Sequence, residues 1–102
     1  MIELDYQLIS KQDTTEPVAI SGNAAIARGI IEASVRVITS YPGTPCAEIM
    51  ENLAFFIKDG SNFHIEWAVN EKVAFESAAS AAVAGVRSAF ITKHAGMNWA
   101  AD

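Results

Sequence analysis

Hydrophobic and polar positions along this chain alternate between helix-like and strand-like spacing after residue 17. Apolar residues recur every three or four positions in three segments. The first follows the cap residues 21–23 and ends at Ala33, and the other two are 47–58 and 71–84. Short apolar runs of the length of buried strands separate them, at 35–40, 63–69 and 86–92. This alternation predicts an α/β domain with a parallel sheet flanked by helices.

Three segments carry more specific expectations. Helix 71–84 is rich in alanine, so we expect it to lie close against the sheet or a neighbouring helix. The run 86–92 has almost no polar residue, which is typical of a central parallel strand. Residues 93–98 are expected to form a glycine-containing loop, and a helix is expected to begin near Met97 and continue to Asp102.

The first sixteen residues differ from the rest. Ile2, Leu4, Tyr6 and Leu8 alternate with polar residues, which is the period of a half-exposed strand over 2–8. Residues 11–16 are polar and are interpreted as a linker that Pro17 closes. We therefore divide the chain into a polar leader at 1–16 and an α/β domain at 17–102.

Composition narrows the class of protein. The chain has 102 residues, a formal net charge of −5 and 51% hydrophobic residues, which is enough for one small packed domain. The negative net charge argues against nucleic acid and anionic membrane surfaces as partners. No apolar run approaches the roughly 18 to 20 residues that a membrane span needs, and the N-terminus lacks the pattern of a signal peptide. The single cysteine excludes an internal disulfide framework, and we expect a cytoplasmic protein.

Candidate chemistry gathers where the predicted strands end. In open α/β sheets, ligands bind beyond the carboxyl ends of the strands. Three segments follow such ends here, namely 41–45, 70–71 and 93–96. Because parallel strands end at the same edge, we expect these three segments to lie together and the stiff Tyr-Pro-Gly-Thr-Pro corner to be part of a ligand site.

Each candidate residue at that edge also has an ordinary structural explanation. Glu71 falls in the first turn of a helix, where the helix dipole stabilises a carboxylate without any catalytic role. A helix-start acid is the commoner case, and a catalytic carboxylate is the alternative. His94 suits capping or hydrogen bonding more often than catalysis. Cys46 lies near a helix N-terminus, but the sequence shows no charged partner that would make it reactive.

Four segments together resemble a known family. They are SGNAAIARGIIEASVRV, YPGTP followed by EI, EWAVNEKVAFE and GVRSAFITKHAGMNWAAD, and they cover about residues 20–102. In this order and spacing they resemble the thiamine-diphosphate-dependent 2-oxoacid:ferredoxin oxidoreductases. The similarity is to the N-terminal pyrimidine-binding (PYR) domain of the indolepyruvate enzyme's alpha subunit. That domain has a parallel α/β fold with more strands than the three predicted here, so the resemblance implies a truncated form of it.

The resemblance assigns roles to individual residues. Glu71 matches the family glutamate that binds N1′ of the aminopyrimidine and drives formation of the nucleophilic ylid. Tyr41, Pro42 and Gly43 would shape the wall of the cofactor site. The substrate-binding positions are Thr44 and His94. Two departures from the family pattern are Ala24, where a glutamate is usual, and Cys46-Ala47, where small serines are common.

The implied function is therefore part of an enzyme. The chain would supply the cofactor-activating glutamate to a shared thiamine diphosphate site in an indolepyruvate-like 2-oxoacid:ferredoxin oxidoreductase, and would be inactive alone. Mg²⁺ and iron–sulfur clusters would bind through regions that this chain lacks. The expected partners are a second copy of the chain, a missing C-terminal part or partner subunit and, indirectly, ferredoxin. The alternatives are a non-catalytic binding or assembly module and the alpha chain of a two-chain thiamine-diphosphate 2-oxoacid decarboxylase.

Overall fold

The computed structural model describes residues 17–57 and 62–102, in which helices and strands alternate. The elements in chain order are α2 (Gly22–Glu32), β1 (Val37–Ser40), α3 (Ala47–Ile57), β2 (His64–Trp67), α4 (Glu71–Val83), β3 (Ser88–Ile91) and α5 (His94–Ala101). The predicted leader 1–16, with its possible strand 2–8, lies outside the described residues. Within the described part, the predicted order of elements is confirmed, although each strand is shorter than the apolar run that indicated it.

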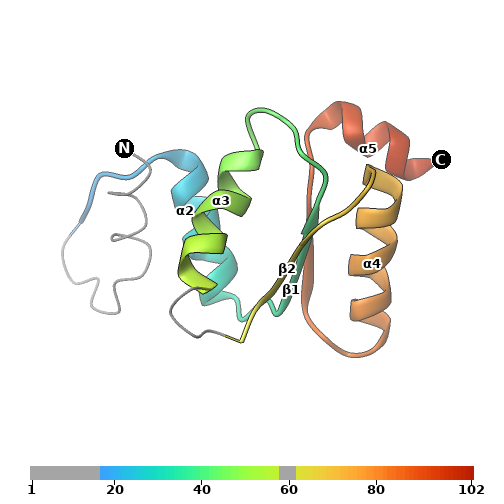
Figure 1. Ribbon diagram of the computed structural model, residues 1–102. Helices are drawn as coiled ribbons and strands as arrows, with labels where there is room; N and C mark the ends of the chain where they lie inside the picture. Colours follow the sequence, from blue (N-terminus) through green and yellow to red (C-terminus); the bar gives the residue numbers. More distant parts are fainter. Residues whose placement is uncertain (1–16, 58–61) are drawn as a thin grey trace.

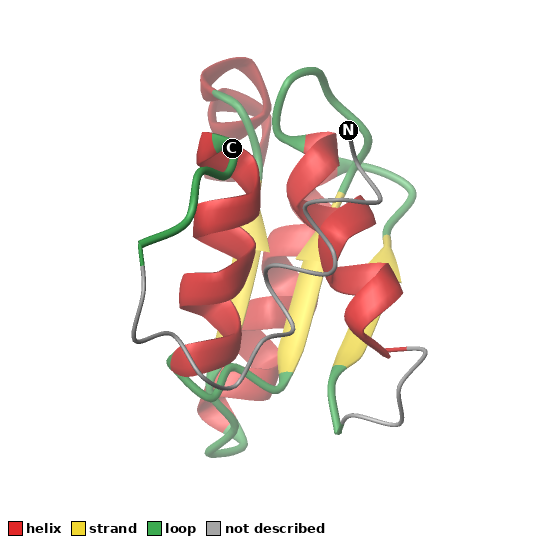
Figure 2. Ribbon diagram, turned by 90° about the vertical axis from the view of Figure 1, so that its left-hand side faces the viewer, coloured by secondary structure: helices red, strands yellow, loops and turns green. Residues whose placement is uncertain are grey.

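The strands form one parallel sheet in the order β2-β1-β3. Val37 of β1 lies level with His64 of β2 and with Ser88 of β3. In Figure 1 the sheet is seen between α2 and α3 on one side and α4 and α5 on the other, and Figure 2 shows helices in front of the strands and behind them. The predicted fold class, an α/β parallel sheet flanked by helices as in PYR-like domains, is confirmed.

The position of the central strand differs from the prediction. In the sheet that the described residues form, β1 is central and β3, within the apolar run 86–92, lies at one edge. Thr39 and Ser40 of β1 are fully buried although both are polar. Their hydroxyls donate to the carbonyl oxygens of Ala74 (2.6 Å) and Ile91 (2.7 Å). Because these hydrogen bonds satisfy the hydroxyls, a strand that is less hydrophobic than its neighbour occupies the centre.

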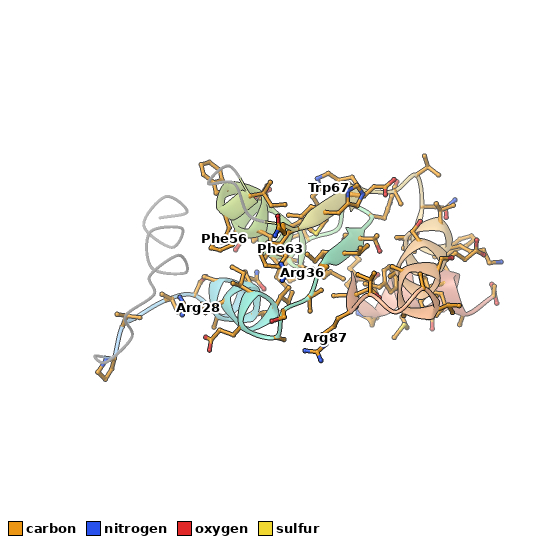
Figure 3. All side chains as sticks on the ribbon, turned by 90° about the horizontal axis from the view of Figure 1, so that it is seen from below. Arg28, Arg36, Phe56, Phe63, Trp67 and Arg87 are labelled. Atoms are coloured by element: carbon orange, nitrogen blue, oxygen red, sulfur yellow. The ribbon has the colours of Figure 1, made fainter. Side chains whose placement is uncertain are left out.

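The face covered by α2 and α3 contains the hydrophobic core. Its buried residues are Ala24, Ala27, Val35, Ile38, Ile49, Met50, Leu53 and Ile91. Small residues on α2 share this core with larger ones on α3 and β1, and α2 and α3 pack against each other. At the β2 edge, Phe56 and Phe63 meet edge to face with ring centroids 5.6 Å apart, and the Arg36 guanidinium lies 5.9 Å from the Phe63 ring centre (Figure 3).

The opposite face is covered by α4, which packs through small side chains. Ala74 and Ala78 are buried between the helix and the sheet. The hydroxyl of Thr39 on β1 reaches the Ala74 carbonyl, and that of Ser88 on β3 reaches the Ala78 carbonyl at 2.7 Å. The predicted close approach of the alanine-rich helix is therefore confirmed.

Helix α5 begins earlier than predicted. The expected loop over 93–98 is wrong, because α5 starts at His94 with Lys93 as its N-cap residue. Neither the glycine at 96 nor the absence of a side-chain cap favours a helix here. The buried Gly96 lies against α4, and α4 and α5 are in extensive contact. Tertiary packing thus overrides the weak local preference.

Candidate functional site

The carboxyl ends of the three strands meet at one edge of the sheet, at the top of Figure 1. There β1 leads into the loop 41–46, β2 into Asn70 and α4, and β3 into Lys93 and α5. The first and third of these segments lie close together, because a methyl group placed on Gly43 would be 4.0 Å from Cδ of Lys93. The predicted convergence of the three segments is confirmed.

A cavity of about 530 Å³ opens at this edge. It is lined by Tyr41, Asn70, Glu71, Lys72, Trp99 and Asp102. Two aromatic rings thus form walls of the cavity, and carboxyl groups from α4 and from the end of the chain lie beside them. Its volume is within the range of small-molecule binding sites, and its lining combines aromatic with charged side chains.

Glu71 is the half-buried acid of this cavity. Asn70 caps α4, because its side-chain oxygen accepts a hydrogen bond from the Val73 amide at 2.9 Å. Side-chain capping of α4 is therefore done by the residue that precedes Glu71. The Glu71 side chain lies beside Gly96, such that a methyl group on Gly96 would be 2.8 Å from Glu71 Cγ and 3.2 Å from Oε1.

The position of Glu71 depends on how α4 is held. The Thr39 and Ser88 hydroxyls come from neighbouring strands and bind helix carbonyls four residues apart, on the stripe that faces the sheet. These two hydrogen bonds fix α4 along its axis. Because Ala74 is three residues from Glu71, the first of them constrains the turn that carries the carboxylate.

The loop after β1 is fastened by polar contacts. The Gly43 carbonyl accepts hydrogen bonds from the Ala47 amide (2.9 Å) and the Cys46 thiol (3.3 Å). The Asn23 side chain donates to the Pro45 carbonyl at 3.0 Å, which connects the loop to the start of α2. The Thr44–Pro45 peptide bond is cis. Cys46 therefore has a hydrogen-bonding role in the loop.

The structure brings some of the predicted site residues together and leaves others apart. Tyr41 and Glu71 line the same cavity, and Gly43 lies two residues after Tyr41 in the loop that follows β1. Thr44 lies exposed in the turn before α3, and His94 lies exposed at the first position of α5. Neither is among the described residues that line the cavity, nor is Pro42. Their assigned roles stay predictions.

Sequence reasoning missed three lining residues: Lys72, which follows Glu71 on α4, and Trp99 and Asp102 near the end of the described chain. Trp99 is 69% exposed and stands three positions after Gly96 on α5. Residues three apart on a helix share a face, so this spacing puts Trp99 on the same side of α5 as Gly96, which the structure sets against Glu71. The sequence carries no signal for that contact between α4 and α5. Asp102 follows the last helical residue and had no pattern of its own.

Comparison with known proteins identifies the family. Residues 28–100 match the family model described as pyruvate flavodoxin/ferredoxin oxidoreductase, thiamine diphosphate-binding. The chain belongs to this family. The resemblance found in the sequence motifs is thereby confirmed, and the matched span includes Glu71 and every described element from β1 to β3.

Curated relatives are consistent with the same family of oxidoreductases. The chain is similar to the indolepyruvate oxidoreductase subunit IorA of Archaeoglobus fulgidus, with 47% identity over 90 residues, 85% of this chain and 14% of the relative. The IorA of Thermococcus kodakarensis is 46% identical over 87 residues, 85% of this chain and 13% of the relative. That of Methanothermobacter thermautotrophicus is 48% identical over 81 residues, 79% of this chain and 13% of the relative. The chain thus spans about one-seventh of the length of these relatives.

Two further observations concern the described residues alone. In 17–57 and 62–102, no helix combines the length and apolar character required to cross a bilayer. In the same ranges, no group of three or more His, Cys, Asp or Glu side chains is placed so that it could hold a metal ion.

Proposed function

We propose that this chain is the pyrimidine-binding part of a thiamine-diphosphate-dependent 2-oxoacid oxidoreductase, with Glu71 as the carboxylate that contacts the cofactor's aminopyrimidine. The observation that carries the proposal is the cavity at the carboxyl edge, which Tyr41, the half-buried Glu71 and Trp99 line together. A flat, partly polar ring fits this donor set, because aromatic walls bury its faces while a carboxyl group contacts a ring nitrogen. Family membership supports the choice of thiamine diphosphate.

The roles that we propose for the cofactor and for the residues of this chain follow from their chemistry. When bound, thiamine diphosphate supplies a carbon nucleophile for the carbonyl group of a 2-oxo acid. Glu71 exchanges a proton with the ring nitrogen that it contacts. The aromatic side chains of Tyr41 and Trp99 border that contact. The loop 41–46 borders the substrate side, where we place Thr44 and His94.

The substrate, electron acceptor and further cofactors belong to the wider proposal. Similarity to IorA supports an indolepyruvate-like 2-oxo acid as substrate. We place Mg²⁺, the iron–sulfur clusters and the contact with ferredoxin in regions beyond this chain, and the assembly in the cytoplasm. Accordingly, the purified chain should show no oxidoreductase turnover with indolepyruvate and a ferredoxin acceptor, and measurable turnover by the chain alone would contradict this.

The direct test is Glu71→Gln in an assembly of the chain with the remaining parts of the enzyme. Amide and carboxyl have similar shapes, so folding and assembly should be retained. Turnover should fall by about 10²- to 10⁴-fold, the contribution of a positioned proton-transfer group. The rate of 2-oxo acid oxidation and calorimetric binding of thiamine diphosphate with Mg²⁺ provide the two measurements.

Glu76→Gln is the matched control for this variant. Glu76 lies on the same helix and is exposed, so its amide variant should behave as the wild type. Wild-type turnover of the Glu71 variant would reduce that residue to a helix-start acid. Binding of thiamine diphosphate without any oxidation of 2-oxo acids would favour a decarboxylase chain, and no binding in any assembly would favour a non-catalytic module.

We also propose that the chain self-associates. Large apolar side chains are exposed on several elements of the described part, including Trp67, Val69, Val83 and Met97. In the sheet that the described residues form, β2 and β3 each have one neighbour, and unpaired strand edges invite pairing. Sedimentation at high micromolar concentration should show a dimer or larger species, and a strictly monomeric chain would count against the proposal.

A further inference from the structure

The first turn of α5 packs against the start of α4 beside Glu71. Gly96 is buried there, within an otherwise exposed stretch of α5. A methyl group on this residue would overlap the Thr92 hydroxyl and would lie 2.8 Å from Glu71 Cγ, a distance that real Cβ atoms do not adopt. The space that a side chain at 96 would fill is therefore occupied by the side chains of Thr92 and Glu71.

We propose that Gly96 is a positioning residue for Glu71. The absence of a side chain at 96 lets the carboxylate stem lie across the first turn of α5, from where the carboxyl group borders the cavity beside Trp99. Any larger residue forces the Glu71 side chain into another rotamer or moves α5 away from α4. Either change alters the direction of the carboxyl group relative to the cavity.

Two other helical glycines provide contrast within the same chain. Gly22 and Gly29 of α2 have no atom within 4 Å of the place where a methyl group would lie. Alanine is the better helix former, so Gly29→Ala should raise stability in the middle of α2. A close neighbour thus distinguishes Gly96 from these two glycines. The conclusion that Gly96 matters for catalysis rests on the proposed function. The conclusion that Gly96 fixes the position of the Glu71 side chain does not.

The test compares Gly96→Ala with Gly29→Ala in the 102-residue chain. Gly29→Ala should raise the melting temperature, whereas Gly96→Ala should lower it by roughly 5–15 °C, as overpacking does in a domain of this size. The second measurement is the ¹³C resonance of the Glu71 carboxyl, assigned from its loss in Glu71→Gln. It should move in the Gly96 variant and stay in place in the Gly29 variant.

A rescue experiment identifies the residue with which Gly96 is coupled. Thr92→Ala removes the hydroxyl that the new methyl group would overlap, so the remaining conflict of Gly96→Ala in this background is with Glu71. Adding Glu71→Ala should then restore most of the lost melting temperature. Adding Lys72→Ala, on the neighbouring exposed residue of the same cavity, should not.

Three results would overturn the inference. The first is a Glu71 carboxyl resonance that does not move in Gly96→Ala. The second is a rescue of the melting temperature by Lys72→Ala as large as that by Glu71→Ala. The third is failure of the triple variant Thr92→Ala/Gly96→Ala/Glu71→Ala to fold although Thr92→Ala folds. None of these readouts uses thiamine diphosphate. A chain that passes them but never binds the cofactor would refute the proposed function and leave the role of Gly96 standing.

Discussion

The two faces of the sheet are covered by helices in different ways. On the α2 and α3 face, bulky side chains such as Ile38, Met50 and Leu53 are almost fully buried against one another. On the α4 face, alanines and two hydroxyl-to-carbonyl hydrogen bonds bring the helix close to the strands. The first face buries apolar volume, which stabilises the fold, and the second fixes the location of one helix, which places Glu71. Stability and positioning are thus separated between the two faces.

Truncating the bulky face should give the largest change in stability. Leu53→Ala creates a cavity beneath α3 at a side chain that is 1% exposed, and should lower the free energy of unfolding by about 2–5 kcal/mol. Denaturant unfolding measures the loss. Phe55→Ala, on the same helix but 42% exposed, should cost much less. If the Leu53 variant also shifts the Glu71 carboxyl resonance, the two faces are not separate in the way described.

Removal of the helix caps should change stability by an intermediate amount. Asn70 caps α4 and Ser21 caps α2, each accepting a hydrogen bond from a backbone amide three residues on. Alanine at either position should cost about 0.5–2 kcal/mol of unfolding free energy. Only Asn70→Ala should also weaken calorimetric binding of thiamine diphosphate in the assembled enzyme, because Asn70 borders the cavity. Equal effects on binding from both variants would remove the distinction between the two regions.

The smallest expected effect comes from the hydrogen bonds beneath α4. Thr39→Val keeps the shape of the side chain and removes the donor to the Ala74 carbonyl, for an expected loss of about 0.5–1.5 kcal/mol. Hydrogen exchange should show faster opening of α4 while α3 is unchanged. Ser80→Ala is the control, because its hydroxyl bonds to Glu76 within the same helix and does not reach the sheet. Unchanged exchange in α4 would show that the Thr39 hydroxyl does not hold the helix.

Much of the architecture could be predicted from periodicity. The order of elements and the convergence of 41–45, 70–71 and 93–96 at one edge follow from local spacing and from the rule that parallel strands end together. The four motif segments over residues 20–102, taken together, pointed to the family that the match over residues 28–100 confirms. The order of strands was not predictable from hydrophobicity, because the partners of Thr39 and Ser40 are 35 and 51 residues away in the chain.

The sequence by itself therefore determined the class of fold, the family and the residue type at the candidate site. Only the tertiary structure decided that β1 is central, that α5 begins at His94 and that Glu71 lies against Gly96. The physical reason is the range of the interactions. Periodicity and capping act over three or four residues and are visible in the sequence, whereas the burial of a hydroxyl or the close approach of two helices depends on groups that folding alone brings together.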